Sequence, residues 1–519
     1  MTSGNTSKQN KIVEIILQSE MGYSIKNKIH NSLPDHFESK QALKDKMKTL
    51  LSNAEIKQSI CNEIYRFNSK YKVNQGKEEV DYLLEAQKKW EEQLIKSINT
   101  IASERGKPLA APMGDHDVAN FRRKWKSLGT EMNEDTNYKP IYSQKDLFAY
   151  LCKIRNPNYK EFVMGQETRG TLGLIKIPLA TIDIKELQNQ FIDLSLDRSH
   201  IGVEQADNSN TNPIEEQVVL ALSAASTSSL IPVALRACRF GVTPSLRCTL
   251  WPLALDIDLE SRKGQIEFIN LEKDVLTNSL LLDQIFINDV KSNSANDDNY
   301  FVFEDPTLQV LLCAARDYKM MSMYTHSNAS PLKCVNKLID GGQEIVAYPP
   351  SGLIPMYGVS YFISPLCYVF SHHWKIYSTF TAMYTRYFHK LTVISTDTNS
   401  ILSLSKHFEM LLIEKHPMLF LHLISCGIQP LKFAFRWMTC AFAGYLEAEQ
   451  VLLLWDRIIG FKSLLLLPIA ATAIFEFRSS NLMQVQRSEE AEAVLYNLNH
   501  VAIIPLIQQF LFVPNQLLI

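Results

Sequence analysis

The sequence lacks an ordered pattern of cysteines. Its nine cysteines are scattered, their number is odd, and no two of them form a Cys-x-x-Cys pair. A disulfide framework needs paired cysteines and a zinc site needs closely spaced ligands, so the pattern argues against both. The adjacent His372 and His373 have no acidic or cysteine ligand at a suitable spacing. We therefore expect reduced thiols, as in a cytosolic protein, and no bound metal.

Charge of one sign and long apolar runs are also missing. The formal net charge is -2, which gives no reason to expect a nucleic-acid partner. Residues Met1–Asn10 are polar and lack the apolar core of a signal peptide. The uncharged stretch between Glu344 and Lys375 contains four prolines and two glycines, which would break a membrane-spanning helix. The expectation is a cytoplasmic chain without a transmembrane segment.

Familiar catalytic motifs are absent as well. The chain contains no G-x-x-x-x-G-K-[ST] phosphate loop, no G-x-S-x-G elbow and no H-E-x-x-H helix. An intrinsic hydrolase is therefore not expected. With 519 residues, of which 46% are hydrophobic and 21% charged, the chain is typical of a globular protein with two to four domains.

Three regions differ in pattern. Residues 1–135 carry helical periods, first over Ile12–Ile25 and then in a predicted amphipathic helix that begins near Glu78. This helix either packs on a partner helix or forms a docking surface. Residues 136–235 form a mixed α/β connecting segment, with a β-like run at 172–179 and a polar linker near 205–213. Residues 236–519 are predicted to be all-α. The apolar face of the amphipathic helix comprises Leu83, Trp90, Leu94, Ile98 and Ile101.

The segment GVTPSLRCTLWPLAL, residues Gly241–Leu255, predicts the start of a helix. Thr243 is suited to cap a helix whose first residue is Pro244. Arg247 and Trp251 are four residues apart and therefore share one helix face. A buried arginine is costly unless it is paired, so we expect a structural ion pair at this position.

Five elements follow in order between His416 and Pro468, with short connections. Together with the Arg-x-x-x-Trp pair, this order resembles the TBC domain of Rab GTPase-activating proteins. Trp437 and Trp455 are expected to be core aromatics, and Asp456 is expected to pair or cap locally. Within the family, YPPSGLIP and NDDNYFVFED are most similar to the member-19 group. The five elements are Leu419–Leu423, Gly427–Pro430, the helix of Trp437, Glu447–Glu449 and Leu454–Asp456.

The resemblance implies a mechanism with two fingers inserted into the GTPase. An arginine from an I-x-x-D-x-x-R signature stabilises charge on the transferring phosphoryl group, which is worth about 10³–10⁵ in rate. In the matching segment LDQIFINDVKS, Asp289 falls on the aspartate position and Ser292 on the finger position. Lys291 is one residue out of register. Serine cannot supply a planar charged fork.

The second finger is a glutamine from a Y-x-Q signature, which orients the attacking water. The best match is PMYGVSYFISPLCYVF, with Gly358 on the family glycine and Pro365 on the helix proline. Tyr357 then occupies the glutamine position and Pro355 the tyrosine position. Both fingers are therefore predicted to be substituted. Lys291 and Arg316 are weak substitutes for the arginine finger, and Gln343 is a further candidate. Arg316 and Gln343 are each more readily explained as ordinary surface residues.

The resemblance implies a regulator of Rab-class small GTPases in vesicle trafficking, expected to activate GTP hydrolysis. GTP and magnesium would be bound by the partner GTPase, so no cofactor of this chain is expected. Contact with endomembranes would be peripheral. Two alternatives stay open at this point. The chain is either a non-catalytic Rab-binding scaffold, or a helical adaptor that keeps the TBC core but binds no GTPase.

Overall fold

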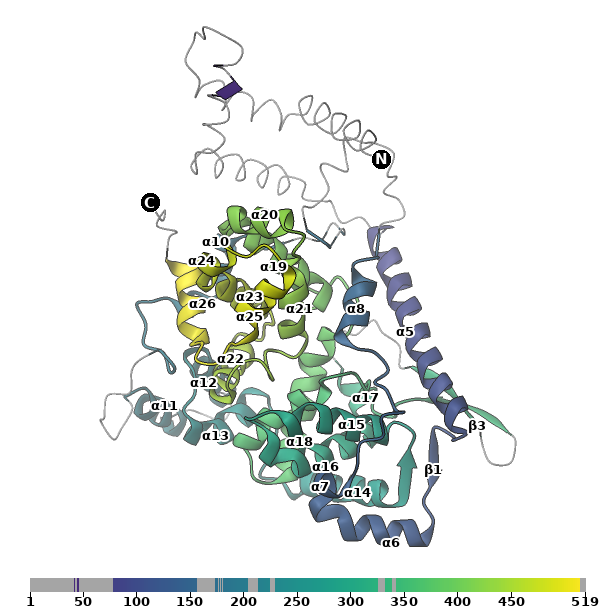
Figure 1. The fold of residues 1–519 in the computed structure, drawn as a ribbon. Helices are drawn as coiled ribbons and strands as arrows, with labels where there is room; N and C mark the ends of the chain where they lie inside the picture. Colours follow the sequence, from purple (N-terminus) through teal and green to yellow (C-terminus); the bar gives the residue numbers. More distant parts are fainter. Residues whose placement is uncertain are drawn as a thin grey trace, which may run out of the picture.

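A computed structural model describes residues 42, 44–45, 78–155, 173–175, 177, 179, 181–203, 213–224, 229–324, 332–337 and 342–513. The helical period predicted over Ile12–Ile25 lies outside these residues, as does most of the linker near 205–213. The described chain is mainly helical (Figure 1), which confirms the predicted fold class. The division at residues 135 and 235 stays a prediction.

The described elements follow one another in this order: α5 (Glu78–Arg105), β1 (Ala110–Pro112), α6 (Asp115–Lys124), η1 (Trp125–Ser127), α7 (Leu128–Glu131), α8 (Gln144–Leu151), α10 (Ile184–Gln190), η2 (Ile192–Leu194), α11 (Pro213–Ala224), α12 (Leu230–Phe240), α13 (Pro244–Ala254), α14 (Arg262–Thr277), β2 (Asn278–Leu280), α15 (Asp283–Ser292), η4 (Ser294–Asn296), η5 (Phe301–Phe303), α16 (Glu304–Arg316), α17 (Met320–Met323), β3 (Lys333–Lys337), β4 (Gln343–Ala347), η6 (Val359–Phe362), η7 (Ser364–Tyr368), α18 (His373–Arg386), η8 (Phe388–Leu391), α19 (Ile401–Lys415), α20 (Pro417–Ser425), α21 (Pro430–Thr439), α22 (Ala448–Phe461), α23 (Leu466–Phe477), α24 (Ser479–Leu482), α25 (Ser488–Tyr496) and α26 (Ile503–Phe512).

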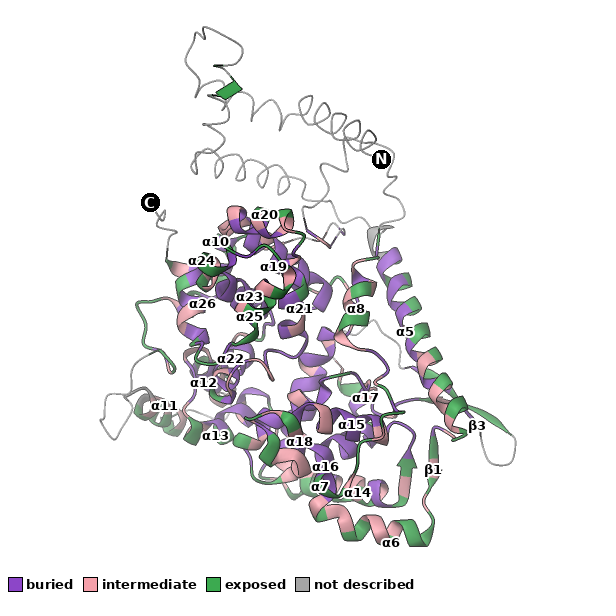
Figure 2. Ribbon diagram, in the orientation of Figure 1, coloured by how far each residue is buried: buried purple, intermediate pink, exposed green. Residues whose placement is uncertain are grey.

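The core lies among the C-terminal helices. Helix α23 packs against α19, α21 and α26, and α22 packs against α12 and α26. A second group, formed by α14, α16 and α18, lies beside it. Figure 2 shows α16, α19, α22 and α23 as largely buried, whereas most of α14 is half-buried or exposed. Residues Leu466–Phe475 of helix α23 are buried in this core.

Helix α5 forms as predicted. It begins at Glu78, and four of its five predicted apolar positions are buried while Ile101 is partly buried against the core. The opposite face, which carries Glu85, Lys88, Lys89, Glu92 and Lys96, is exposed. The ring of Trp90 contacts Tyr142 and Tyr150, each at a centroid distance of 5.1 Å. The buried face of α5 therefore packs against the rest of the chain, as the first of the two readings predicted.

The β-like run at 172–179 does not form a strand at its described positions. Ile175 and Ile177 are buried there, but the backbone N–H groups of Leu174 and Ile175 donate to the carboxylate of Glu409 instead of to a neighbouring strand. In the described part of 136–235 the elements are helical, with one isolated bridge at Tyr142. The Glu409 carboxylate therefore accepts the N–H groups that a neighbouring strand would bind if this segment were part of a sheet.

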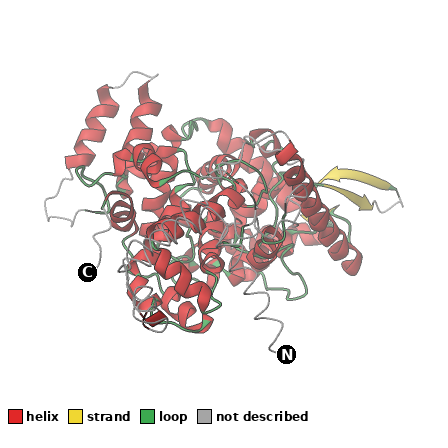
Figure 3. Cartoon of the chain, turned by 90° about the horizontal axis from the view of Figure 1, so that it is seen from above, coloured by secondary structure: helices red, strands yellow, loops and turns green. Residues whose placement is uncertain are grey.

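The strands are short and lie elsewhere. β1 pairs antiparallel with β2, and β3 with β4, so the C-terminal region is helical with small two-stranded additions. The β3–β4 hairpin stands out at the edge of the molecule (Figure 3). Among the described residues, no single helix is long and apolar enough to cross a bilayer. Of the helices that the structure describes, only α20 and α21 taken together pass that test, and they are bent by 109° at their junction.

Candidate functional site

Ser292, which the sequence predicts to stand at the arginine-finger position, is the last residue of α15. It is partly buried, and its hydroxyl donates to the exposed Glu134 carboxylate over 3.2 Å. The neighbouring Lys291 forms an ion pair with Glu304, the first residue of α16. The finger position thus carries a neutral hydroxyl beside an acidic group, and the adjacent cation is engaged within the chain.

The carboxylate of Asp289 joins the two signature segments. Asp289 is 5% exposed and accepts hydrogen bonds from the backbone N–H groups of Gly358 (2.6 Å) and Ser360 (2.8 Å). The side-chain amide of Asn293 donates a third, over 2.8 Å. Burial raises the pKa of Asp289 to about 6, although these hydrogen bonds favour the ionised form. The sequence placed Asp289 in the motif but did not indicate that it anchors the second motif.

The second finger position lies on a tight turn next to α15. Gly358 has a φ of +90°, a backbone conformation that residues with a Cβ rarely adopt. Tyr357, immediately before it, is 41% exposed, and its backbone N–H donates to the carbonyl of Tyr142. Pro365 is buried in the first turn of η7. The turn presents the Tyr357 side chain at the surface, and the sequence predicts this to be the position of the family's glutamine.

Residues 142–144, which were not predicted to belong to the site, lie against this turn. Tyr142 forms a parallel bridge with Met356, and the next helix, α8, begins at Gln144. A Cβ built on Gly358 would lie 3.0 Å from the Cys440 sulfur and 3.8 Å from the Gln144 amide nitrogen. Residues from three parts of the chain therefore meet at this point, namely 142–144, the turn at 356–358 and Cys440. The only sequence signal was the residue order Tyr-Ser-Gln at 142–144.

Arg316 is not an ordinary surface residue, contrary to expectation. It is 4% exposed and forms a two-pronged ion pair with Asp283, with N–O distances of 2.9 and 2.8 Å. It also donates to the carbonyl oxygens of Leu312 and Asn278. Gln343 is exposed, in strand β4 of the projecting hairpin. Arg316 is held in a buried structural pair, so it is poorly suited to act as a substitute finger.

Arg247 and Trp251 converge on Asp456 of α22. The Trp251 indole N–H donates to Asp456 Oδ1 over 2.7 Å, and the Arg247 guanidinium lies 3.2–3.4 Å from both carboxylate oxygens. The backbone N–H of Val242 donates to Oδ2 over 3.1 Å. The neighbouring Arg457 is farther away, at 3.9 Å. Asp456 therefore pairs mainly with residues that are distant in sequence, whereas we expected it to pair or cap locally.

The helix containing Arg247 begins at Pro244, as predicted, but Thr243 does not cap it with its side chain. Its hydroxyl contacts Ser245 instead, at 2.9 Å. The two other family tryptophans are core residues, with Trp437 3% exposed and Trp455 fully buried. These positions belong to the packing of the domain.

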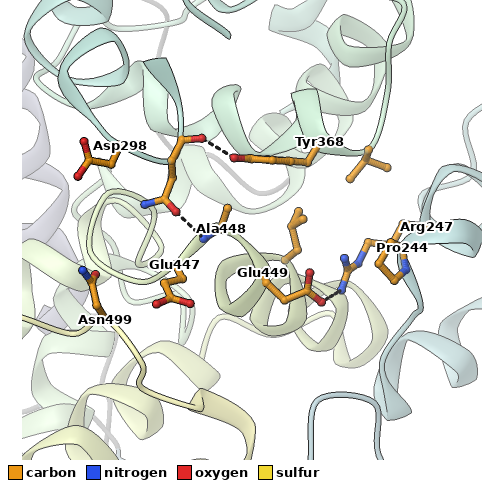
Figure 4. A pocket seen from close by; sticks show the side chains of 11 residues that line it. Pro244, Arg247, Asp298, Tyr368, Glu447, Ala448, Glu449 and Asn499 are labelled. Carbon is orange, nitrogen blue, oxygen red and sulfur yellow. Dashed lines mark hydrogen bonds and ion pairs between the residues drawn. The ribbon is translucent and has the colours of Figure 1, made fainter. Parts of the chain in front are cut away.

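A cavity of about 450 Å³ lies beside this cluster (Figure 4). Arg247 reaches one wall of it, 3.8 Å from Glu449, and Tyr368 donates to the carbonyl of Asn299 on the opposite side. None of the lining residues belongs to α15 or to the turn at Tyr357. The cavity and the finger positions are therefore separate features.

Comparison with known proteins decides the family. Residues 356–483 match the RabGAP-TBC family, described as the Rab-GTPase-TBC domain. The chain is 38% identical over 437 residues to human TBC1 domain family member 19, which covers 84% of this chain and 83% of the relative. The chain belongs to the Rab-GTPase-TBC domain family. This confirms the family predicted from the sequence.

Two solved TBC structures are also similar to this chain. The Ypt/Rab-GAP domain of Gyp1p aligns with a TM-score of 0.42 and 13% identity, over 58% of this chain and 97% of that domain. The TBC domain of a Chlamydomonas flagellar RabGAP aligns with a TM-score of 0.40 and 14% identity, over 58% of this chain and 92% of that domain. Membership of the TBC family indicates a role in regulating Rab GTPases.

Proposed function

We propose that this protein recognises the GTP-bound form of a Rab-class GTPase and stimulates its GTP hydrolysis. The recognition surface comprises the C-terminal end of α15 and the turn at Met356–Ser360. The observation that carries this proposal is the Asp289 carboxylate, which accepts the N–H groups of Gly358 and Ser360. Through it, the two segments that supply the fingers in this family form one surface here.

The proposed stimulation is weaker than that of a family member with both fingers. At the arginine position, Ser292 brings no positive charge, and its partner Glu134 is acidic. Because an arginine finger is worth about 10³–10⁵ in rate, its loss removes the largest electrostatic contribution. GTP and Mg²⁺ are bound by the partner. The protein itself acts at the cytoplasmic surface of endomembranes, without a nucleic-acid partner.

The second candidate is a Rab-binding protein that does not stimulate hydrolysis. Lys291 and Arg316, the two cations considered as substitutes, are both held in intramolecular ion pairs, and this favours a non-catalytic role. A helical adaptor that binds no GTPase is the third candidate. The nucleotide bound to the Rab distinguishes the first two candidates from the adaptor. A Rab regulator binds the GTP-bound form more tightly, whereas an adaptor binds neither form preferentially.

The test is binding of the full-length chain to a panel of Rab proteins, each loaded with GDP or with a non-hydrolysable GTP analogue. At least one Rab is expected to bind at least tenfold more tightly in the GTP form. The variant Tyr357→Ala should weaken that binding by about tenfold, or ~1.4 kcal/mol, because it removes an exposed aromatic contact. The matched control is Tyr496→Ala, in α25, whose side chain is 82% exposed.

Equal binding of both nucleotide forms would leave the adaptor as the better account. Equal loss of affinity in both tyrosine variants would show that the recognition surface lies elsewhere. Absence of binding across a broad panel contradicts the proposed function outright.

A further inference from the structure

Residues 142–144 read Tyr-Ser-Gln, the residue order of the family's glutamine-finger signature, and they lie beside the segment where that signature is substituted. The backbone N–H of Ile141 donates to the carbonyl of Pro355, and that of Tyr357 donates to the carbonyl of Tyr142, each over 3.3 Å. With Tyr142 and Met356 as partners in a parallel bridge, the two segments run in the same direction. Gln144 is thereby brought level with Gly358.

The N-terminal part of this segment is firmly anchored. Tyr142 is 4% exposed, its ring packs edge-on against Trp90 of α5, and its hydroxyl contacts the Met356 sulfur at 3.3 Å. Ser143 caps helix α8 through a reciprocal pair of hydrogen bonds with Asp146. Gln144 is the first residue of that helix, so its backbone is fixed while its side chain extends from a helix end.

The Gln144 side chain points toward the substituted finger turn. It is partly buried, and its amide nitrogen lies 2.8 Å from the sulfur of Cys440. A neutral thiol is a weak acceptor, so this contact holds the amide in place without a strong competing hydrogen bond. Because Gly358 has no Cβ, the turn can lie close to Gln144 and to the Cys440 sulfur, which a Cβ would approach to 3.0 Å.

We propose that Gln144 supplies the water-orienting amide that the substituted signature at Tyr357 does not. The inference rests on the proposed function. An amide carries its acceptor and its donors on different atoms, so it can accept a hydrogen bond from the attacking water and donate one to the phosphate. The water oxygen bonds to the γ-phosphorus, the bond from that phosphorus to the β–γ bridging oxygen breaks, and the products are GDP and inorganic phosphate. The water's protons pass to phosphate and solvent, and Gln144 is left unchanged.

In this proposal, α5 and the segment that follows it hold Gln144 in position. In the proposed arrangement the glutamine comes from outside residues 236–519, and its placement depends on the contact between Trp90 and Tyr142. The charge-stabilising arginine has no counterpart at Ser292. The protein therefore acts with one finger, contributed by a segment that precedes the domain carrying the family motifs.

The test is single-turnover GTP hydrolysis by the Rab that the chain binds, with saturating full-length protein. The wild type is expected to accelerate hydrolysis more than tenfold. Gln144→Ala should lose at least tenfold of that acceleration, because removing one stabilising donor typically costs about 10²–10³ in rate. Affinity for the GTP-bound Rab should change by less than about twofold. Gln93→Ala, at an exposed position of α5, is the matched control and should behave as wild type.

A second variant, Gln144→Glu, keeps the size of the side chain but removes the N–H donor and adds a negative charge next to the phosphate. It should lose acceleration as Gln144→Ala does, and both variants should unfold at the wild-type temperature. Wild-type acceleration in both variants overturns the inference and leaves the proposed function intact. A parallel loss of affinity overturns it too, because Gln144 would then be a binding contact. Binding without any acceleration by the wild type overturns it together with the stimulation that the proposed function includes, whereas no binding at all also refutes the recognition of a Rab.

Discussion

Replacing the buried carboxylate of Asp456 should destabilise the protein severely. In Asp456→Asn the side chain keeps its shape but loses its charge, and one of its two acceptor oxygens becomes an NH₂ group. Asp456 is fully buried, and the side chain of its partner Arg247 is 2% exposed. The variant therefore leaves the buried guanidinium with only the longer contact to Glu449, at 3.8 Å, as compensation for its charge.

The size of the effect follows from these contacts. Breaking a buried ion pair by removing one partner costs about 3–5 kcal/mol. The donors from Trp251 and Val242 also face Asp456, and a buried donor left unsatisfied costs a further ~1–3 kcal/mol. With an unfolding entropy of about 2.1 cal/mol/K per residue, a cooperative unit of 519 residues shifts by ~0.9 °C per kcal/mol, so a total loss of about 4–8 kcal/mol lowers the unfolding midpoint by roughly 4–7 °C.

The assay is thermal unfolding followed by tryptophan fluorescence, with Glu492→Gln as the control. Glu492 forms an exposed ion pair with Arg436 at 3.2 Å, and such a pair contributes less than about 1 kcal/mol. The double variant Arg247→Met/Asp456→Asn should be more stable than the sum of the two single losses predicts, because the two side chains are coupled. An Asp456→Asn midpoint within 2 °C of wild type, or additive losses, would refute the reasoning.

Two further predictions concern pH and the finger position. His200 is 1% exposed, and burial followed by the charge of Arg457 lowers its pKa from 6.5 to about 4. As the pH falls, the His200 imidazole is protonated in the unfolded chain before it is protonated in the folded chain. The contribution of His200 to stability is therefore complete above pH 6.5 and is lost as the pH falls toward 4. The stability of wild type relative to His200→Phe, measured by urea unfolding, should fall by about 3 kcal/mol between pH 7 and pH 4, and a constant difference would contradict this. Ser292→Arg should raise single-turnover acceleration at least tenfold. Adding Glu134→Ala should raise it further by removing a competing carboxylate 3.2 Å from the Ser292 hydroxyl, and unchanged rates in both variants would show that Ser292 does not face the nucleotide.

Local patterns predicted much of the fold. The helical period placed α5 from Glu78, and Pro244 marked the first residue of α13. These signals depend on residues within a few turns of one another, and a sequence displays them directly. The same reasoning predicted the buried family tryptophans, because an aromatic residue on a helix face needs a core.

Long-range choices of partner could not be predicted. Asp456 had an adjacent arginine, yet its closest charged partner is Arg247, 209 residues away. Arg316 ends a helix, a position typical of exposed residues, but Asp283 holds it in the interior. The run at 172–179 has strand-like residues, and only the fold reveals that Glu409 accepts its N–H groups. In each case the deciding group lies far away in sequence, where no local pattern reports it.

The contacts within the candidate site could not be predicted either, because they too join residues that are distant in sequence. Alignment with the family motifs placed Ser292 and Tyr357 at the finger positions, but each motif was considered by itself. The Asp289 carboxylate that joins them, and the Gln144 side chain that lies beside Gly358, both depend on contacts across the fold. Tyr-x-Gln is too short a pattern to stand out in a sequence, and it gains significance only from its position.

The most direct test of the account is single-turnover GTP hydrolysis by a broad panel of Rab proteins with excess wild-type chain. The account predicts acceleration of more than tenfold for at least one Rab, and for that Rab a preference for binding the GTP-bound form. An unchanged intrinsic rate for every Rab would contradict the claim that this protein stimulates GTP hydrolysis.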